Sequence, residues 1–277
     1  MKLHIAQSHG FCFGVRRAIG LANNVENNPK YLLGEIVHNK EVNNDFIQRG
    51  FSILEEPCEC TPGVGVIRAH GICKDDYNQF VEKGFDLIDG TCPIVKANTK
   101  KASKGENPLI IVGKEHHPEI KYMISYIQRD YYIVDHVPDV DKLNPEIEYD
   151  LMVQTTFSTE LFDEILMRLE ERNIKYFKKN GICLASVRRR RAVLNLCEFC
   201  DHILIVGDNH SSNSQALKSL AASQGITSYI ISRADELEAQ MLDCKNLGLS
   251  SGASVSNETF EAVKNKIVEL CPDCLTD

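Results

Sequence analysis

Short apolar runs alternate with longer amphipathic segments along most of the chain. The runs are rich in Val, Ile and Leu, which is typical of buried strands, whereas the longer segments repeat their apolar positions with a helical period. This pattern predicts strands at residues 2–8, 63–70, 85–91, 108–113, 131–136, 149–156, 202–208, 228–232 and 246–252. It predicts helices at residues 15–27, 74–84, 117–129, 159–173, 213–225 and 258–270. Strands that alternate with helices favour an α/β fold with mostly parallel sheets.

The bulk composition fits a globular protein and argues against two classes. The 277 residues are 43% hydrophobic and 25% charged, which is ordinary for a chain long enough to bury a substantial core. A net charge of −8 disfavours general nucleic-acid binding, which uses basic surfaces. The longest apolar runs, such as LIIV and ILIV, are far too short to span a bilayer, and no early segment has the pattern of a signal peptide. We therefore expect a cytoplasmic protein in a reducing compartment, with neither nucleic acid nor membrane as a partner.

The eleven cysteines require an explanation. An odd number in a reducing compartment argues against a disulfide framework, so most are expected to be buried small side chains or ligands. The pairs CEFC and CPDC, at residues 197–200 and 271–274, have the spacing of zinc or redox sites. Cys197, however, falls on an apolar helical stripe with Val193 and Cys200, so packing in the core is the simpler interpretation. A zinc-binding or redox-sensing module remains an alternative class of function.

Three cysteines share one local pattern. Cys12, Cys92 and Cys183 each lie two residues after a glycine and directly before a stretch typical of a helix start. The intervals of 80 and 91 residues are close to a third of the chain, and such a repeat predicts three α/β units that each present one cysteine at a strand-to-helix turn. A helix N-terminus favours a thiolate, and three thiolates brought to one centre would suit an iron–sulfur cluster with one iron left open. The alternative is three buried cysteines beside tight turns.

Polar side chains cluster where several of the predicted strands end. Hydroxyls, amides and imidazoles beside helix N-termini are typical of a phosphate or diphosphate site. These strand ends, with a further candidate strand at GEIVHN, carry His38, His70, His117, Glu119, Gln154, Thr155, Ser211, Ser212, Asn213 and Ser254. Each is ordinary when taken alone, since serines and asparagines before a helix are usually caps. The number of such strand ends is what predicts a diphosphate site.

Nine short segments form a recognisable ordered set along the chain. In chain order, from Gly10 to Ser254, they read GFCFGVRRA, EIVHNKEV, RAHGI, DGTCPIV, EHHPE, QTTFS, GICLAS, SSNS and GAS. In this order they resemble the 4-hydroxy-3-methylbut-2-enyl diphosphate reductase family over essentially the whole chain. The resemblance implies three pseudo-symmetric α/β domains, with mostly parallel sheets, around a central iron–sulfur cluster. We place the domains at residues 13–92, at residues 93–180, and at residues 1–12 together with 181–277.

The same resemblance implies a reaction, a cofactor and a site. The reaction is the reductive dehydroxylation of (E)-4-hydroxy-3-methylbut-2-enyl diphosphate to isopentenyl and dimethylallyl diphosphate, the last step of the non-mevalonate isoprenoid pathway. The implied cofactor is one [4Fe–4S] cluster with one open iron, held by Cys12, Cys92 and Cys183 and reduced by a ferredoxin or flavodoxin. Glu119 is the implied proton donor, and Thr155 matches a threonine near the substrate hydroxyl. The implied diphosphate ligands are His38, His70, His117, Ser211, Ser212, Asn213 and Ser254.

Two other interpretations stay open. Glu119 follows Pro118 and fits an ordinary first-turn carboxylate of a helix, a role compatible with proton donation. The nearest alternative function is another three-cysteine iron–sulfur enzyme that acts on a different phosphorylated metabolite.

The chain departs from the family pattern after the third cysteine. The family usually has Thr-x-x-Arg-Gln; here a serine leads into a run of arginines in which Arg189 aligns with the usual arginine and Arg190 replaces the glutamine. The run Arg188–Arg191 is interpreted either as a patch that docks an acidic electron donor or as a solvated helix face. Further on, the usual proline after GAS is missing, which predicts that Ser256 or Asn257 caps the next helix.

Overall fold

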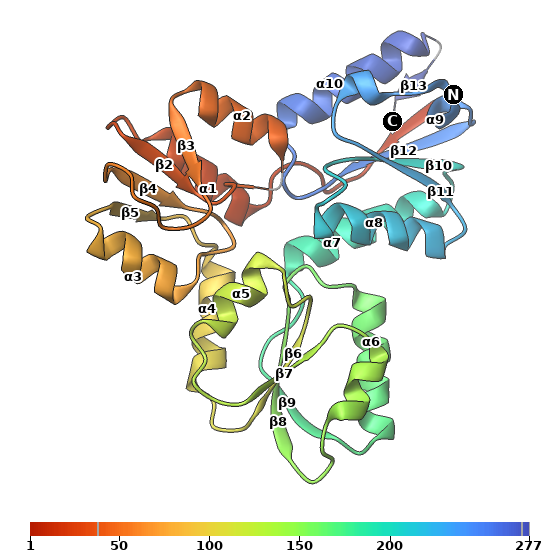
Figure 1. Ribbon diagram of the computed structural model, residues 1–277. Coiled ribbons are helices and arrows are strands. Elements are labelled where there is room, and N and C mark those ends of the chain that lie inside the picture. Colours follow the sequence, from red (N-terminus) through yellow and green to blue (C-terminus); the bar gives the residue numbers. More distant parts are fainter. Residues whose placement is uncertain (38, 273, 277) are drawn as a thin grey trace. The chain divides into compact units, whose positions relative to one another are not determined.

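Thirteen strands form three parallel sheets in the computed structural model, which describes residues 1–37, 39–272 and 274–276 (Figure 1). Every pair of neighbouring strands within a sheet runs parallel. This arrangement confirms the predicted class of three α/β units with parallel sheets. Within the described ranges, no helix is long and apolar enough to cross a membrane.

The first sheet has the strand order β3-β2-β4-β5. Its strands are β2 (Lys30–Leu33), β3 (Phe51–Leu54), β4 (Val64–Ile67) and β5 (Asp86–Asp89). The helices along this part of the chain are α1 (Phe13–Asn23), α2 (Lys40–Gln48) and α3 (Lys74–Glu82). Phe80 of α3 is buried in one cluster with Tyr31, Leu33 and Ile67, which attaches that helix to the sheet.

The second sheet has the order β7-β6-β8-β9. Its strands are β6 (Leu109–Val112), β7 (Tyr131–Val134), β8 (Glu148–Val153) and β9 (Lys175–Lys178). Its helices are α4 (Pro93–Lys104), α5 (Pro118–Ile124), the 3-10 helix η1 (Val137–Lys142) and α6 (Thr159–Glu171).

Strand β6 is buried on both faces. Ile110 and Val112 pack in a cluster with α6, whereas Leu109 and Ile111 pack in a cluster with α5. Burial of each such side chain contributes about 2 kcal/mol to stability. A strand covered on both faces reads as a continuous apolar run, which explains why LIIV was recognisable in the sequence.

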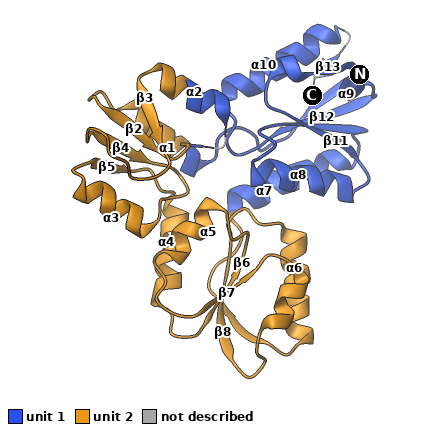
Figure 2. Ribbon diagram, viewed as in Figure 1, with its two compact units in different colours: residues 1–15, 37–44, 184–277 blue, residues 16–36, 45–183 orange. Residues whose placement is uncertain are grey.

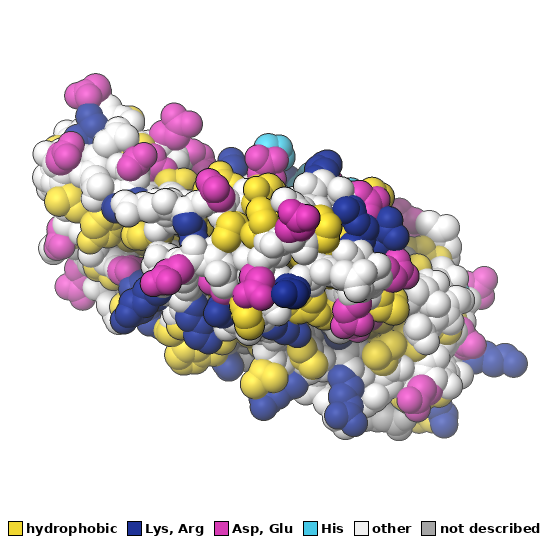
Figure 3. Space-filling view, turned by 90° about the horizontal axis from the view of Figure 1, so that it is seen from below, with side chains coloured by type: hydrophobic (Ala, Val, Ile, Leu, Met, Phe, Trp, Pro, Cys, Tyr) yellow, Lys and Arg dark blue, Asp and Glu magenta, His cyan; other side chains and the backbone are white. Residues whose placement is uncertain are grey.

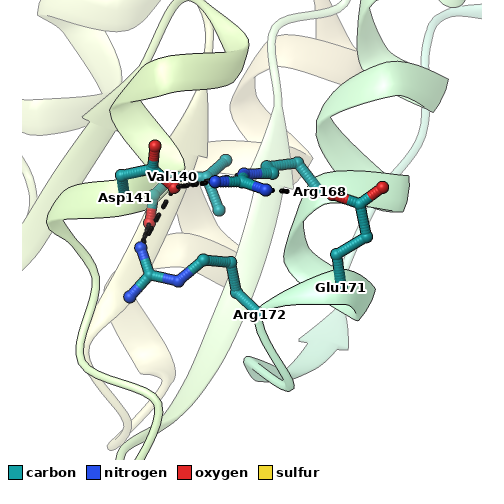
Figure 4. Close-up of polar contacts among 5 residues, drawn as sticks. All are labelled: Val140, Asp141, Arg168, Glu171 and Arg172. Atoms are coloured by element: carbon teal, nitrogen blue, oxygen red, sulfur yellow. Dashed lines mark hydrogen bonds and ion pairs between the residues drawn. The ribbon is translucent and has the colours of Figure 1, made fainter.

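A group of ion pairs joins η1 to α6 (Figure 4). Asp141 accepts hydrogen bonds from Arg168 at 2.8 Å and from Arg172 at 3.1 Å, and Arg168 also pairs with Glu171 at 3.0 Å. These arginines hold the pKa of the Asp141 carboxyl below its usual range. Solvent-exposed ion pairs add little to stability. The buried face of α6 therefore contributes most of the energy that holds this helix against the second sheet.

The third sheet has the order β11-β10-β12-β1-β13. Its strands are β1 (Lys2–Ile5), β10 (His202–Val206), β11 (Thr227–Ile231), β12 (Asn246–Ser251) and β13 (Leu275–Thr276). Its helices are α7 (Leu184–Cys197), α8 (Ser212–Ser223), the 3-10 helix η2 (Ala234–Glu236), α9 (Ala239–Leu242) and α10 (Asn257–Leu270). Ser256 caps α10 through a hydrogen bond from the backbone N–H of Thr259 at 3.0 Å, which confirms one of the two predicted caps.

The three sheets repeat one strand order. In each, the first strand lies between the second and the third, and a fourth strand lies beside the third. In the third sheet β1 takes the fourth place, although it is the first strand of the chain. The chain therefore supplies the fourth strand of its last sheet from its N-terminus, and β13 adds a fifth strand beside it.

By compactness, the described chain divides into two units (Figure 2). One unit, residues 1–15, 37–44 and 184–277, holds the third sheet; the other, residues 16–36 and 45–183, holds the first two sheets. The three domain boundaries expected from the sequence stay a prediction.

The sequence pattern missed β2, β3, β9 and β13, and it gave no bounds for α2, α4, α7 or α9. The candidate strand at GEIVHN is wrong in position: the strand is β2, which ends at Leu33, and residues 36–37 form a bend. The chain turns at Gly34, whose φ of +77° is incompatible with a continuing strand. His38, the expected end of that strand, lies outside the described residues.

Candidate functional site

The three Gly-x-Cys cysteines have one backbone setting. Cys12, Cys92 and Cys183 lie directly before α1, α4 and α7, which confirms the predicted helix starts. Each donates its backbone N–H to a carbonyl oxygen two residues beyond the third strand of a sheet. The acceptors are, in that order, Ala253 at 3.1 Å, Ala69 at 2.9 Å and Thr155 at 3.0 Å. The repeat predicted from spacing is thus also a repeat of hydrogen bonding.

The donor chemistry at these positions fits an iron–sulfur cluster. All three side chains are half-buried, all eleven cysteines are described, and none of them forms a disulfide. Thiolates at helix starts are the ligands such clusters use. Cys12 belongs to one compact unit, and Cys92 and Cys183 belong to the other. In the described part of the chain, no three His, Cys, Asp or Glu side chains form a metal-binding group, so the convergence of the three thiols stays a prediction.

Glu119 and Thr155 form a buried pair. The Thr155 hydroxyl donates to Oε2 of Glu119 at 2.6 Å, and the Thr155 backbone N–H donates to Oε1 at 2.9 Å. Glu119 is only 1% exposed, and burial raises the pKa of its carboxyl to about 7, although both hydrogen bonds from Thr155 oppose the rise. The pair therefore holds a proton that it can release near neutral pH.

Two histidines lie beside this pair. His117 caps α5 by accepting the backbone N–H of Glu119 on Nδ1 at 3.1 Å, so in the neutral ring Nε2 carries the hydrogen. The ring of His70 lies 5.4 Å from that of His117, at 85° to it. Within one unit the structure thus brings together His70, His117, Glu119 and Thr155, and Thr155 also binds the backbone of Cys183.

Gly71 sets the loop that carries His70. Its φ is +83°, and a Cβ at this position would lie 2.6 Å from the ring of Tyr122. Only glycine therefore allows both the turn and the contact with Tyr122. The sequence signal was the glycine in RAHGI, but nothing in the sequence pointed to Tyr122.

The expected hydroxyl and amide ligands lie in the other unit. Ser211, directly before α8, accepts the backbone N–H of Ser214 at 3.4 Å, so its capping role is confirmed. Asn213 is buried, and its amide nitrogen has no partner among the described residues. Ser254 accepts a hydrogen bond from Asn39 on its carbonyl at 2.9 Å. Because β10 and β12 are neighbours, the segments after them lie at one edge of the sheet.

The two interpretations of the arginine run need correction. Arg189 and Arg190 are buried, with exposed fractions of 3% and 6%, and only Arg188 and Arg191 are exposed. The run is therefore neither a solvated helix face nor a continuous docking patch. The reason is that the side of α7 that carries Val193 packs into the core, and Arg189 and Arg190 lie on that side.

The CEFC pair belongs to the same core. Cys200 is buried and Cys197 is half-buried in a cluster with Val193 and Leu196. Burial raises the pKa of the Cys200 thiol to about 12, so in this packing the sulfur stays a neutral thiol at physiological pH. Packing, the simpler interpretation of CEFC, is what the structure supports.

The fold and the backbone positions of Cys12, Cys92 and Cys183 define a class of protein. It is a three-sheet parallel α/β protein with one cysteine at a helix start in each repeat. The chain matches the family model described as LytB protein over residues 3–268 and belongs to that family. It is 32% identical to the 4-hydroxy-3-methylbut-2-enyl diphosphate reductase of Actinobacillus succinogenes, over 100% of this chain and 93% of the relative. It is 34% identical to the reductase of the same name from Caldanaerobacter subterraneus, over 98% of both chains.

Two solved structures share the fold. The E-1-hydroxy-2-methyl-but-2-enyl-4-diphosphate reductase of Plasmodium falciparum superposes with a TM-score of 0.90 at 25% identity, covering 100% of this chain and 91% of that one. A structure of (E)-4-hydroxy-3-methyl-but-2-enyl diphosphate reductase, described as the terminal enzyme of the non-mevalonate pathway, gives 0.69 at 28% identity, covering 97% of this chain and 100% of that one.

Proposed function

We propose that this chain reduces (E)-4-hydroxy-3-methylbut-2-enyl diphosphate to isopentenyl and dimethylallyl diphosphate, as the terminal enzyme of the non-mevalonate pathway. The reaction consumes two electrons and two protons and releases the substrate hydroxyl as water. Full-length similarity to reductases of this name supports the reaction. The observation that carries it in the structure is the buried pair of Glu119 and Thr155, an acid and a hydroxyl that can pass one proton.

The proposed cofactor is one [4Fe–4S] cluster with Cys12, Cys92 and Cys183 as its ligands and one open iron. When bound, it supplies single electrons and a Lewis acid for the substrate oxygen. Reducing equivalents come from a ferredoxin or flavodoxin. The chain's own contribution is to hold three thiols at helix starts and to supply the proton.

Thr155 connects the proton donor to the substrate. With Glu119 protonated, the carboxyl donates to the Thr155 oxygen, which frees the Thr155 hydroxyl to donate to the leaving oxygen. The hydrogen bond from the backbone N–H of Cys183 to the carbonyl oxygen of Thr155 holds the threonine beside a proposed cluster ligand. The second proton is proposed to come from the bound diphosphate.

We propose that neutral donors bind the diphosphate. His70 and His117 supply imidazoles, Ser211, Ser212 and Ser254 supply hydroxyls, and Asn213 offers a buried amide without a partner in the described chain. His38 is proposed from the sequence alone. In this proposal, these neutral donors bind the diphosphate tail of the substrate through hydrogen bonds.

Anaerobic purification followed by iron and sulfide analysis and turnover tests this function. We expect conversion of the allylic alcohol diphosphate to both products with reduced methyl viologen as donor. A protein that contains the cluster but reduces only another phosphorylated metabolite would support the alternative enzyme. Zinc without iron would contradict both.

A further inference from the structure

Arg189 is a buried cation surrounded by backbone carbonyls. Its Nη2 donates to Gly10 O at 2.8 Å, and its Nη1 donates to the carbonyls of Ser251 at 2.9 Å and Gly252 at 3.3 Å. In the chain as described, no carboxylate forms an ion pair with it. A buried guanidinium without a carboxylate is costly, so its charge is expected to serve a purpose.

These hydrogen bonds join three segments of one compact unit. Gly10 lies two residues before Cys12, and its own N–H donates to the Ser251 hydroxyl at 2.8 Å. The N–H of Cys12 donates to Ala253, in the same loop. Arg189 itself lies on α7, which begins directly after Cys183. One side chain thus ties the segment before Cys12 to the helix that follows Cys183.

Cys12 is the titratable group whose charge acts on Arg189. Burial lowers the pKa of the guanidinium to about 10, and Cys12 is the group that opposes this fall. The side chain is therefore still a cation at neutral pH. Because Arg189 donates to Gly10, two residues before Cys12, its fixed positive charge favours additional negative charge at that segment.

We infer that Arg189 is a positioning residue for the reductase, which clamps the Cys12 segment and raises the reduction potential of a cluster bound there. The inference rests on the proposed function, because it needs the cluster. It assigns two separable effects to the side chain: hydrogen bonds that hold the loop, and a charge that favours the reduced cluster.

Two substitutions separate these effects. Arg189→Gln removes the charge and most of the hydrogen bonds, whereas Arg189→Lys keeps the charge but cannot reach all three carbonyls. Arg190→Gln is the matched control, since it removes a buried arginine from the next position of α7, where Arg190 donates to Ala216 instead of the Cys12 segment.

The clamp is tested on the apo-protein by amide hydrogen exchange of residues 7–13. Arg189→Gln and Arg189→Lys should both raise the exchange rate there about tenfold or more, and Arg190→Gln should not. The charge is tested on reconstituted protein at a fixed poised potential. The ratio of reduced to oxidised cluster should fall about tenfold in Arg189→Gln and less than threefold in Arg189→Lys.

Unchanged exchange and an unchanged ratio in Arg189→Gln would overturn the inference while leaving the proposed function intact. If Arg189→Gln does not retain a cluster, the lysine variant decides: faster exchange with a preserved ratio supports the inference, and wild-type exchange contradicts it. Absence of any cluster in the wild-type protein would instead remove the proposed function.

Discussion

At the scale of single residues, the proposed site depends on Glu119. The structure confirms that it lies in the first turn of a helix, since α5 begins at Pro118. It adds a partner that local sequence could not show, because Thr155 lies 36 residues further along the chain. Burial and these hydrogen bonds act on the pKa of the carboxyl in opposite directions, and burial prevails.

Replacing Glu119 by Gln should leave the fold intact and remove the acid. We expect kcat to fall about 100-fold or more, as for loss of a general acid, with iron content unchanged. Steady-state kinetics with reduced methyl viologen measure this. The control, Thr155→Ser, keeps the hydroxyl and should retain most of the activity; equal rates for Glu119→Gln and wild type would exclude Glu119 as the donor.

The raised pKa of Glu119 also predicts a pH dependence of stability. Because the carboxyl binds its proton more tightly in the folded state, at a pKa of about 7 against 4.5, its contribution is complete below pH 4.5 and is lost as the pH rises to 7. The loss amounts to about 3 kcal/mol. Urea unfolding of the apo-protein from pH 4 to 8 should show it as a difference from Glu119→Gln, and parallel profiles would contradict it.

At the scale of elements, α7 shows where a local pattern misleads. Four consecutive arginines suggest a solvated or docking surface, yet the helical period places Arg189 and Arg190 on the side that faces the core. Which side of a helix is buried depends on the sheet it covers, and composition alone does not reveal that. The same helix also shows what local pattern does predict, since its start after Cys183 was expected.

The turn at Gly71 follows β4 and includes His70, a proposed diphosphate ligand. Gly71→Ala should raise KM several-fold, because a Cβ there would collide with Tyr122 and displace His70. Gly50→Ala is the matched control: its φ is +88°, but the nearest atom to its Cβ is 3.7 Å away, in Lys30. Both variants should lose about 1 kcal/mol of stability from the backbone strain, and only Gly71→Ala should bind substrate more weakly. Equal KM values in the two variants would show that Gly71 does not contribute to substrate binding at the proposed site.

At the scale of the whole molecule, three repeats each supply one cysteine. Charges of both signs are interspersed on the face drawn in Figure 3. The strand order of the repeats makes the three cysteine positions equivalent. Because the three positions are equivalent, replacing any one of the cysteines is predicted to reduce cluster binding to the same extent.

Replacing Cys12, Cys92 or Cys183 by Ser, one at a time, should therefore abolish most cluster binding, measured as iron and sulfide per chain. Cys73→Ser is the matched control, since Cys73 is half-buried and also lies directly before a helix, α3. The Cys73→Ser variant should keep its iron. The substitution should also leave α3 intact, because serine is a good cap at such a position. A cluster that survives any of the three substitutions but not Cys73→Ser would contradict the proposed ligand set.

The sequence by itself determined the α/β class and most of the strands. It did so because strands such as β6 and β10, covered on both faces, must be continuously apolar. It also determined the three cysteines at helix starts, since glycine, cysteine and helix onset are neighbours in the chain. Short or edge strands such as β9 escaped, because a KYFK segment that is largely exposed has no distinctive pattern.

Only the tertiary structure decided how these parts meet. The completion of the last sheet by β1, the pairing of Glu119 with Thr155, and the burial of Arg189 against the Cys12 segment all join residues far apart in the chain. Such contacts depend on which faces pack together, and a local pattern carries the period of an element but not the identity of its neighbour.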